Sequence, residues 1–218
     1  MTQTTNPQLL NLGCGHINPV GWINVDGSNR AWLASKWPWV DGLLTRLRLI
    51  EPTEFSRQTV HANLLKRFPW PDDSIDGIYM GEILEHFTKS EGETVLRECY
   101  RVLKPGAPIR VRVPDFVQYC ESYLGEFRAV QQRDRSQWDE SHDRWVKMFF
   151  DDICVRPPGW FRSYGHFHKW MYDEVTLQLL MQGVGFQEVQ RRRLHDSRLP
   201  GVEEVESREL LVVEAIKP

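Results

Sequence analysis

Near its N-terminus the chain carries Leu10-Asn11-Leu12-Gly13-Cys14-Gly15, an apolar run that ends in a Gly-x-Gly. The run predicts a buried strand, and the glycines predict either a purely structural turn or one that lets a ligand approach the backbone. A second short strand, residues 22–25, leads directly to Asp26. Ligands of open α/β sheets bind at the C-terminal ends of strands, where an acidic residue can accept hydrogen bonds from a ribose. The pattern therefore predicts a cofactor that contains a nucleoside.

Two departures disfavour a dinucleotide such as NAD or FAD. A dinucleotide fingerprint has a third glycine where this chain has Asn18. The acidic residue of a dinucleotide fold usually comes about 20 residues after the glycines, whereas Asp26 comes sooner. Only residues 14–21 separate the glycine turn from the second strand, and Pro19 interrupts them. A full crossover helix does not fit there, so no long helix dipole is available to hold a pyrophosphate.

Further motifs follow in a characteristic order: Asn63-Leu64, Phe68-Pro69-Trp70-Pro71-Asp72-Asp73-Ser74-Ile75-Asp76-Gly77-Ile78-Tyr79, Glu82-Ile83-Leu84-Glu85-His86-Phe87, Arg97-Glu98-Cys99-Tyr100-Arg101-Val102-Leu103-Lys104-Pro105-Gly106 and Ile109-Arg110-Val111-Arg112-Val113-Pro114-Asp115. With the Gly-Cys-Gly opening, this order and spacing resemble the class I S-adenosylmethionine-dependent methyltransferases, specifically the small bacterial type-11 kind. The resemblance extends from about residue 9 to residue 115 and resumes at residues 168–173.

The resemblance implies an α/β fold with a Rossmann-like, seven-stranded, mostly parallel sheet that has one antiparallel strand. Residues 186–192 and 209–217 are expected to form its final hairpin. Sequence patterns also predict helix ends. Ser90 and Glu93 match a capping box before an amphipathic helix, while Asp173 and Gly185 are expected to begin and end a later helix.

The resemblance also implies a set of cofactor-binding residues. The glycine turn would line the methionine and ribose parts of S-adenosylmethionine, and the acid after the second strand would hold the ribose hydroxyls. Asn63 stands where the family often has Asp, yet its amide can still donate to and accept from an adenine edge. The predicted cofactor-binding residues are Gly13, Cys14, Gly15, Asp26, Gly27, Asn63, Leu64, Gly81 and Glu82.

Methyl transfer from a sulfonium needs alignment, and it needs a base only when the acceptor must lose a proton. We predict His86, Asp115 and His168 as the catalytic candidates. For His86 the alternative is a structural hydrogen bond in its turn, and for Asp115 it is a helix cap. Tyr164, His166 and His168 occupy every second position of one segment, which could place the two imidazoles on one side. Together with His86 these histidines are a possible metal site. No metal is expected, because ligand-type spacing is absent elsewhere.

Composition sets the outer bounds. The 218 residues suffice for one domain, 1–218, and the net charge of −3 gives no reason to expect a nucleic-acid or anionic-membrane partner. Four scattered cysteines predict neither a disulfide framework nor a metal cluster. No signal peptide and no apolar run of roughly 18 residues is evident, which predicts a cytoplasmic protein. Nothing in the sequence bears on the oligomeric state.

Two insertions, residues 29–60 and 116–170, interrupt the predicted sheet and hold seven of the nine tryptophans. The tryptophans are expected to form small satellite cores, and the insertions to fold over the C-terminal edge of the sheet as a substrate cover. The predicted function is methyl transfer from S-adenosylmethionine to a small molecule, at a hydroxyl of a saccharide or secondary metabolite.

Three alternatives stay open. The acceptor atom can be nitrogen or carbon, or the acceptor can be a protein or RNA. The chain can be a cofactor-binding module of the same fold without catalytic turnover. A nicotinamide oxidoreductase is the third alternative, and Asn18 weighs against it.

Overall fold

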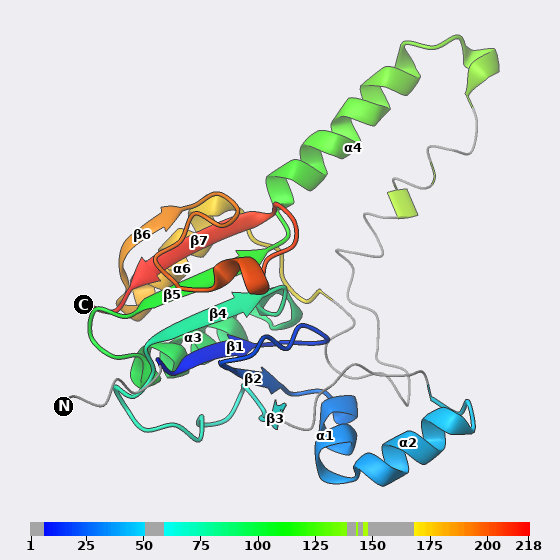
Figure 1. Cartoon of the computed structure of the whole chain (residues 1–218). Coiled ribbons are helices and arrows are strands. Elements are labelled where there is room, and N and C mark those ends of the chain that lie inside the picture. The colour runs from blue at the N-terminus through cyan, green and yellow to red at the C-terminus, as the bar shows by residue number, and fades with distance from the viewer. Residues whose placement is uncertain (1–6, 51–58, 139–142, 144–145, 148–167) are drawn as a thin grey trace.

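The computed structural model describes residues 7–50, 59–138, 143, 146–147 and 168–218. A seven-stranded sheet with strand order β3-β2-β1-β4-β5-β7-β6 lies at its centre (Figure 1). Neighbouring strands among β1 to β5 are parallel, whereas β7 is antiparallel to both β5 and β6. The predicted sheet with one antiparallel strand is confirmed. The strands are β1 (Leu9–Leu12), β2 (Trp22–Asp26), β3 (Val60–His61), β4 (Gly77–Gly81), β5 (Pro108–Val113), β6 (Gln187–Arg191) and β7 (Leu211–Ile216).

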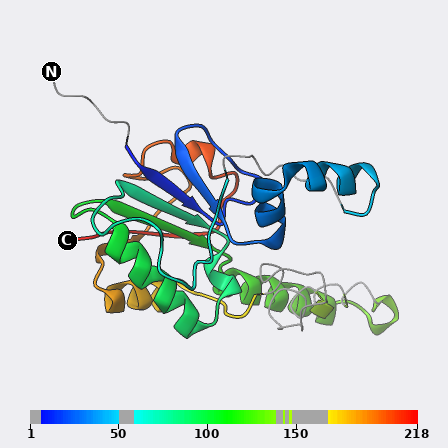
Figure 2. The same cartoon turned by 90° about the horizontal axis from the view of Figure 1, so that it is seen from below.

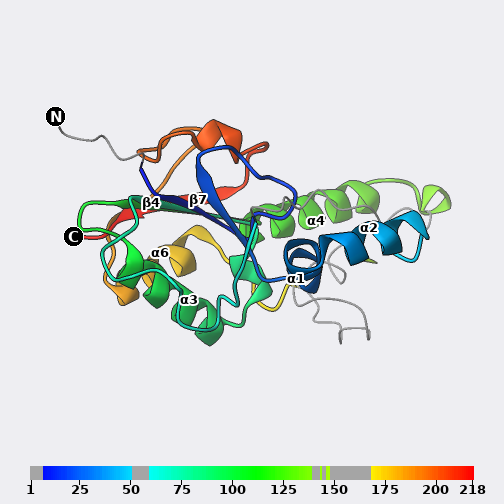
Figure 3. The same ribbon diagram turned by 60° about the horizontal axis from the view of Figure 1, so that its bottom comes forward.

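The two faces of the sheet are covered differently. Helices α3 (Lys89–Val102) and α6 (Glu174–Val184) pack on one face, as Figure 2 shows. The other face is covered by the connection between β6 and β7, which includes the 3-10 helix η5 (Val202–Glu204) (Figure 3). The remaining helices are α1 (Asn29–Lys36), α2 (Pro38–Arg46), η1 (Leu84–His86), α4 (Phe116–Gln131) and η2 (Arg135–Gln137).

Strand β5 shows how this asymmetry arises. Ile109 and Val111 are fully buried in the large core that α3 and α6 share with the sheet. Arg110 points to the other face and is equally buried, because its guanidinium donates to both carboxylate oxygens of Glu206 at 2.7 and 2.8 Å. Glu214, opposite Arg110 on β7, lies 3.4 Å from the same guanidinium. A buried ionic cluster thus fastens the β6–β7 connection to the sheet.

No helix connects β1 to β2, as the short linker predicted. Two buried asparagines hold this linker instead. The Asn11 amide donates to the carbonyl of Ile17 at 2.9 Å and to the Asn24 side-chain oxygen at 3.0 Å. The Asn24 amide in turn donates to the carbonyl of Pro19 at 3.1 Å. Buried polar groups require partners, and here the partners are the backbone carbonyls that a helix would otherwise satisfy.

The capping box of α3 lies two residues before the predicted one. Thr88 Oγ1 accepts from the N–H of Glu91 at 3.3 Å, and the Glu91 carboxylate accepts from the N–H of Thr88 at 2.8 Å. The prediction that Ser90 and Glu93 form the box is wrong, because both residues lie inside the helix. Threonine and serine cap helices by the same chemistry, so the pattern alone allowed either start.

The ends of α6 were predicted correctly. Asp173 accepts from the N–H of Thr176 at 2.7 Å, and Gly185 ends the helix with a φ of 116°. The following strands, β6 and β7, form the predicted antiparallel pair.

Helices α1, α2 and α4 leave the sheet at its C-terminal edge, where both insertions begin (Figures 1 and 3). Their tryptophans do not form the expected buried satellite cores, because those that the structure describes are 40 to 68% exposed: Trp32, Trp37, Trp39, Trp138 and Trp170. Trp145 and Trp160 lie outside the described residues. Across the described ranges, no helix has the length and apolar character needed to cross a bilayer.

Candidate functional site

The glycine turn has the backbone geometry that its sequence predicts. Gly13 and Gly15 have φ angles of 70° and 51°, and the N–H groups of Gly13 and Cys14 donate to the carbonyl of Val25 at 2.9 and 3.0 Å. A Cβ on Gly13 would lie only 2.8 Å from Ile83 Cβ, whereas a Cβ on Gly15 would meet nothing within 4 Å. The turn is therefore packed against Ile83 at Gly13 and has open space beside Gly15.

Cys14 contributes to this turn as a neutral thiol. Its side chain is buried, and burial raises the pKa of the thiol to about 12, with the nearby Asp26 charge adding to the shift. A thiol with that pKa is not a nucleophile at neutral pH.

Asp26 lies at the C-terminal end of β2, directly beside the turn. Its carboxylate accepts from the N–H of Gly15 at 3.2 Å and from the N–H of Ser28 at 2.7 Å. Ser28 also caps α1 through the N–H of Ala31. At the next residue, Gly27, a Cβ would lie 3.0 Å from the carbonyl oxygen of Ala62. The acid is thus held at a fixed place at the C-terminal end of β2.

Asn63 and Leu64, the residues predicted at the adenine, differ in what they present. Asn63 is exposed, and its side-chain oxygen accepts from the N–H of Leu65 at 2.9 Å. Leu64 is buried in the main core. Of these two side chains only that of Asn63 is exposed, and the expectation that its amide meets the adenine stays a prediction.

Gly81 and Glu82 end β4 in a tight arrangement. A Cβ on Gly81 would lie 2.6 Å from the ring of Tyr79, and Glu82 has a φ of 52°, which is uncommon for a residue with a side chain. The Glu82 carboxylate forms ion pairs with Arg112 and Arg208. The charge of Glu82 is therefore already paired with two arginines of the same chain.

His86 and His168 are brought together from positions far apart in the sequence. His86 ends η1, the turn that follows β4, and the two imidazole centroids lie 5.1 Å apart in an edge-to-face arrangement. The main chain fixes this approach, since the N–H groups of Lys169 and Trp170 donate to the carbonyl of Glu85 at 2.7 and 3.2 Å. Tyr164 and His166, which were considered with them, lie outside the described residues.

The sequence analysis overlooked Glu85, which lies between the two histidines and the core. Its side chain is 1% exposed. Glu85, His86 and His168 each have one potential metal-ligand atom, and these three atoms lie within 4.8 Å of one another. Burial raises the pKa of Glu85 to about 8, and the nearby charge of Glu82 adds to the shift. A glutamate next to a histidine was the available clue, but the segment that its carbonyl binds, Lys169 and Trp170, lies 84 and 85 residues further along the chain.

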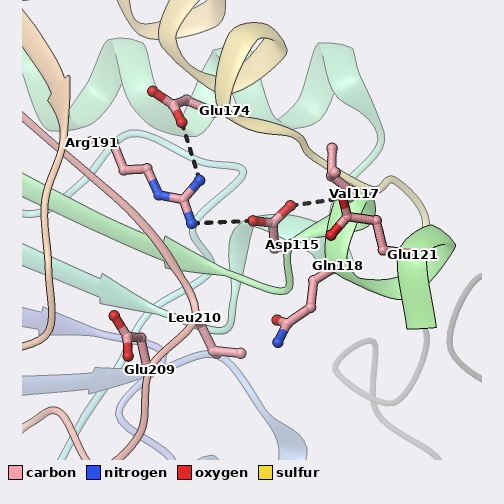
Figure 4. A pocket seen from close by; sticks show the side chains of 8 residues that line it. All are labelled: Asp115, Val117, Gln118, Glu121, Glu174, Arg191, Glu209 and Leu210. Carbon is pink, nitrogen blue, oxygen red and sulfur yellow. Dashed lines mark hydrogen bonds and ion pairs between the residues drawn. The ribbon is translucent and has the colours of Figure 1, made fainter. Parts of the chain in front are cut away.

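Asp115 caps α4, since its carboxylate accepts from the N–H of Val117 at 3.0 Å. The same carboxylate lies 3.4 Å from Arg191, which also pairs with Glu174 at 3.1 Å (Figure 4). These residues line a cavity of about 590 Å³ between α4, α6 and the strands β6 and β7. Four of its lining residues are acidic and one is basic. The complete lining is Asp115, Val117, Gln118, Glu121, Glu174, Arg191, Glu209 and Leu210.

Comparison with known families and structures identifies the chain. Residues 39–111, from α2 to β5, match the type-11 family model described as a methyltransferase domain. The chain is an S-adenosylmethionine-dependent methyltransferase. The matched segment is of the class I, type-11 kind that its motifs resembled, and the cofactor is S-adenosylmethionine. The glycine turn and Asp26 lie before the matched range, so their part in binding the cofactor stays a prediction.

Two solved structures share the fold of this methyltransferase. A methyltransferase from Archaeoglobus fulgidus has a TM-score of 0.50 and 15% identity, over 97% of this chain and 86% of that one. A second, from Methanosarcina mazei, has a TM-score of 0.52 and 17% identity, over 98% and 93% of the two chains. Both are described as dependent on S-adenosylmethionine. No curated protein matches the chain.

Proposed function

We propose that this methyltransferase transfers the methyl group to a hydroxyl of a small molecule, such as a saccharide or another secondary metabolite. The observation that carries the proposal is the pairing of His86 with His168, 5.1 Å apart, directly after β4. This is the sheet edge that also presents the glycine turn and Asp26. An acceptor bound beside the imidazoles would lie close to a cofactor held at those strand ends.

The residues proposed to hold the cofactor are those of the glycine turn, Asp26 and Gly27, with Asn63 and Leu64 at the adenine. Gly81 and Glu82 would pass beside the methionine part. S-adenosylmethionine supplies an electrophilic methyl group when bound. Asp26 accepts two backbone N–H bonds already, and a carboxylate has further lone pairs for a ribose diol.

In this proposal His86 accepts the proton that an acceptor hydroxyl loses as it attacks the methyl carbon. Histidine suits this task because its unperturbed pKa lies near neutrality. His168 stands beside it and would orient either the ring of His86 or the acceptor. Asp115 is already occupied as a helix cap and ion-pair partner, so its proposed part is to shape the acceptor side.

A cavity of about 590 Å³ at the end of β5 supports a small acceptor, because small-molecule sites commonly measure about 300 to 1,000 Å³. Its lining of carboxylates and the Gln118 amide can hydrogen-bond several hydroxyl groups, as a saccharide would need. The net charge of −3 gives no support to a nucleic-acid acceptor.

We further propose that residues 1–218 act as one domain, with the insertions 29–60 and 116–170 as its substrate cover.

An amine is the second candidate acceptor, and the charge of this cavity favours it. Asp115, Glu121, Glu174 and Glu209 face a single guanidinium, that of Arg191. Such a lining attracts a cationic group. A protonated amine must lose its proton before it attacks a methyl group, so His86 would serve this acceptor in the same role.

The experiment that tests the function measures S-adenosylhomocysteine formed from S-adenosylmethionine in the presence of an acceptor panel. The panel pairs each polyhydroxyl compound with its amino analogue of the same size. Turnover with the hydroxyl member of a pair supports the primary proposal, and turnover with only the amino member supports the second. Turnover only with protein or RNA would contradict both.

A further inference from the structure

Glu85 is the most unusual buried group near the proposed site. Its side chain is 1% exposed, and neither carboxylate oxygen has a hydrogen-bond partner in another residue within the part of the chain that the structure describes. A carboxylate in such a place is costly unless it is paired or binds a cation. Arg112 and Arg208, the nearby arginines, form their ion pairs with Glu82 instead.

Two histidines lie beside this carboxylate. One donor atom each of Glu85, His86 and His168 lie within 4.8 Å of one another. Donor atoms around a tetrahedral ion with bonds of about 2.1 Å are about 3.4 Å apart, so modest side-chain rotations would bring these three into range. The backbone needs no rearrangement, because the hydrogen bonds from Lys169 and Trp170 to the Glu85 carbonyl already hold the two segments together.

We propose that Glu85, His86 and His168 form a binding site for a divalent transition-metal ion of the Zn²⁺ class. Two imidazole nitrogens and one carboxylate oxygen suit Zn²⁺ and its neighbours in the first transition row. They do not suit Mg²⁺ or Ca²⁺, which take sets made of oxygen atoms. Three protein ligands also leave a coordination position open, as in catalytic rather than structural zinc sites.

The location of the proposed metal site determines what a bound ion could do to the acceptor. η1 begins three residues after the end of β4, so an ion held there would lie at the sheet edge at which the acceptor is proposed to bind. An ion there lowers the pKa of a coordinated hydroxyl or water. With the ion bound, His86 would be a ligand, and the ion would activate the acceptor in its place. The metal site itself does not depend on the proposed acceptor.

The test uses the full chain, stripped of metal with a chelator, and titrates it with Zn²⁺ by calorimetry and with Co²⁺ by visible absorption. The wild type should bind one equivalent of either ion at micromolar concentration. The variants Glu85→Gln, His86→Asn and His168→Asn should each bind at least about 10-fold more weakly. The control His195→Asn removes a histidine outside the cluster, one whose ring contacts the carbonyl of Glu206, and should bind normally.

Three results would overturn the metal site. The first is no uptake by the wild type, and the second is equal uptake by the wild type and all three cluster variants. The third is a thiolate charge-transfer band in the Co²⁺ spectrum, which would assign the ion to cysteine. Circular dichroism checks folding, and the two histidine variants carry the test if Glu85→Gln does not fold. Asp26→Ala should bind Zn²⁺ normally, so a failed cofactor site and a failed metal site give different results.

Discussion

The N–H of Gly15 donates to the carboxylate of Asp26 at 3.2 Å, which joins the glycine turn after β1 to the acid at the end of β2. The Ser28 N–H holds the other carboxylate oxygen at 2.7 Å. Two strand ends are therefore fixed relative to each other without the crossover helix that usually sets their spacing. A cofactor that contacts both would meet two strand ends that these hydrogen bonds already hold together.

Replacing Asp26 with Ala should weaken S-adenosylhomocysteine binding by roughly 2–4 kcal/mol, the scale of two charge-assisted hydrogen bonds to a ribose diol. Isothermal calorimetry measures the change directly. Ser28→Ala is the matched control, because it removes the α1 cap and leaves the carboxylate in place. Near wild-type affinity in Asp26→Ala would remove this acid from the cofactor site.

Gly13→Ala should destabilise the protein more than Gly15→Ala. Both changes place a side chain at a positive φ, which costs on the order of 1 kcal/mol. Only the Gly13 substitution also forces a Cβ to 2.8 Å from Ile83 Cβ, an atom next to the backbone that cannot swing away. Urea unfolding of the two variants measures the difference, and equal losses would contradict the packing described for Gly13.

His86→Ala should lower turnover by about 10²–10⁴-fold while leaving cofactor affinity largely intact, as expected for the loss of a general base or of a ligand to an activating ion. Steady-state kinetics and calorimetry with S-adenosylhomocysteine separate the two quantities. Assays with and without chelator then separate the base from the ligand. Unchanged turnover on the true acceptor would mean that alignment alone carries the reaction.

Arg110→Ala should cost about 3–5 kcal/mol of unfolding free energy, because it leaves the Glu206 carboxylate buried without its guanidinium partner. The control is Arg97→Ala, which breaks the exposed pair with Glu93 and should cost no more than about 1 kcal/mol. Thermal or urea unfolding reports both. Similar small losses in both variants would show that the β6–β7 connection does not depend on the buried cluster.

Glu98 provides a test by pH. The Arg101 guanidinium and the N–H of Phe68 hold the pKa of Glu98 below its ordinary value. Its stabilising contribution is therefore complete above the unfolded pKa of about 4.3 and is lost as the pH falls through the lower folded value. The stability difference between wild type and Glu98→Gln should be constant near neutrality and shrink below about pH 4.3. A difference that grows on acidification would reverse the assigned sign.

Several features of this methyltransferase followed from neighbouring residues alone. The positive φ of Gly13, the missing helix before β2 and the caps at Asp173 and Gly185 each depend on a few consecutive residues. The wrong capping box of α3 marks the limit of that approach, since Thr88 and Ser90 offer the same capping chemistry two residues apart. Conformational limits and caps act over about one turn, so sequence determines them nearly completely.

Tertiary structure decided what lies buried and what is paired across long distances. Arg110 and Glu85 carry charges that a sequence places at the surface, yet both are buried by segments about 80 to 100 residues away. Asn11 and Asn24 likewise gain their roles only when β1 and β2 lie side by side. The cost of burying a polar group depends on which partners the fold supplies, and the sequence near that group does not contain them.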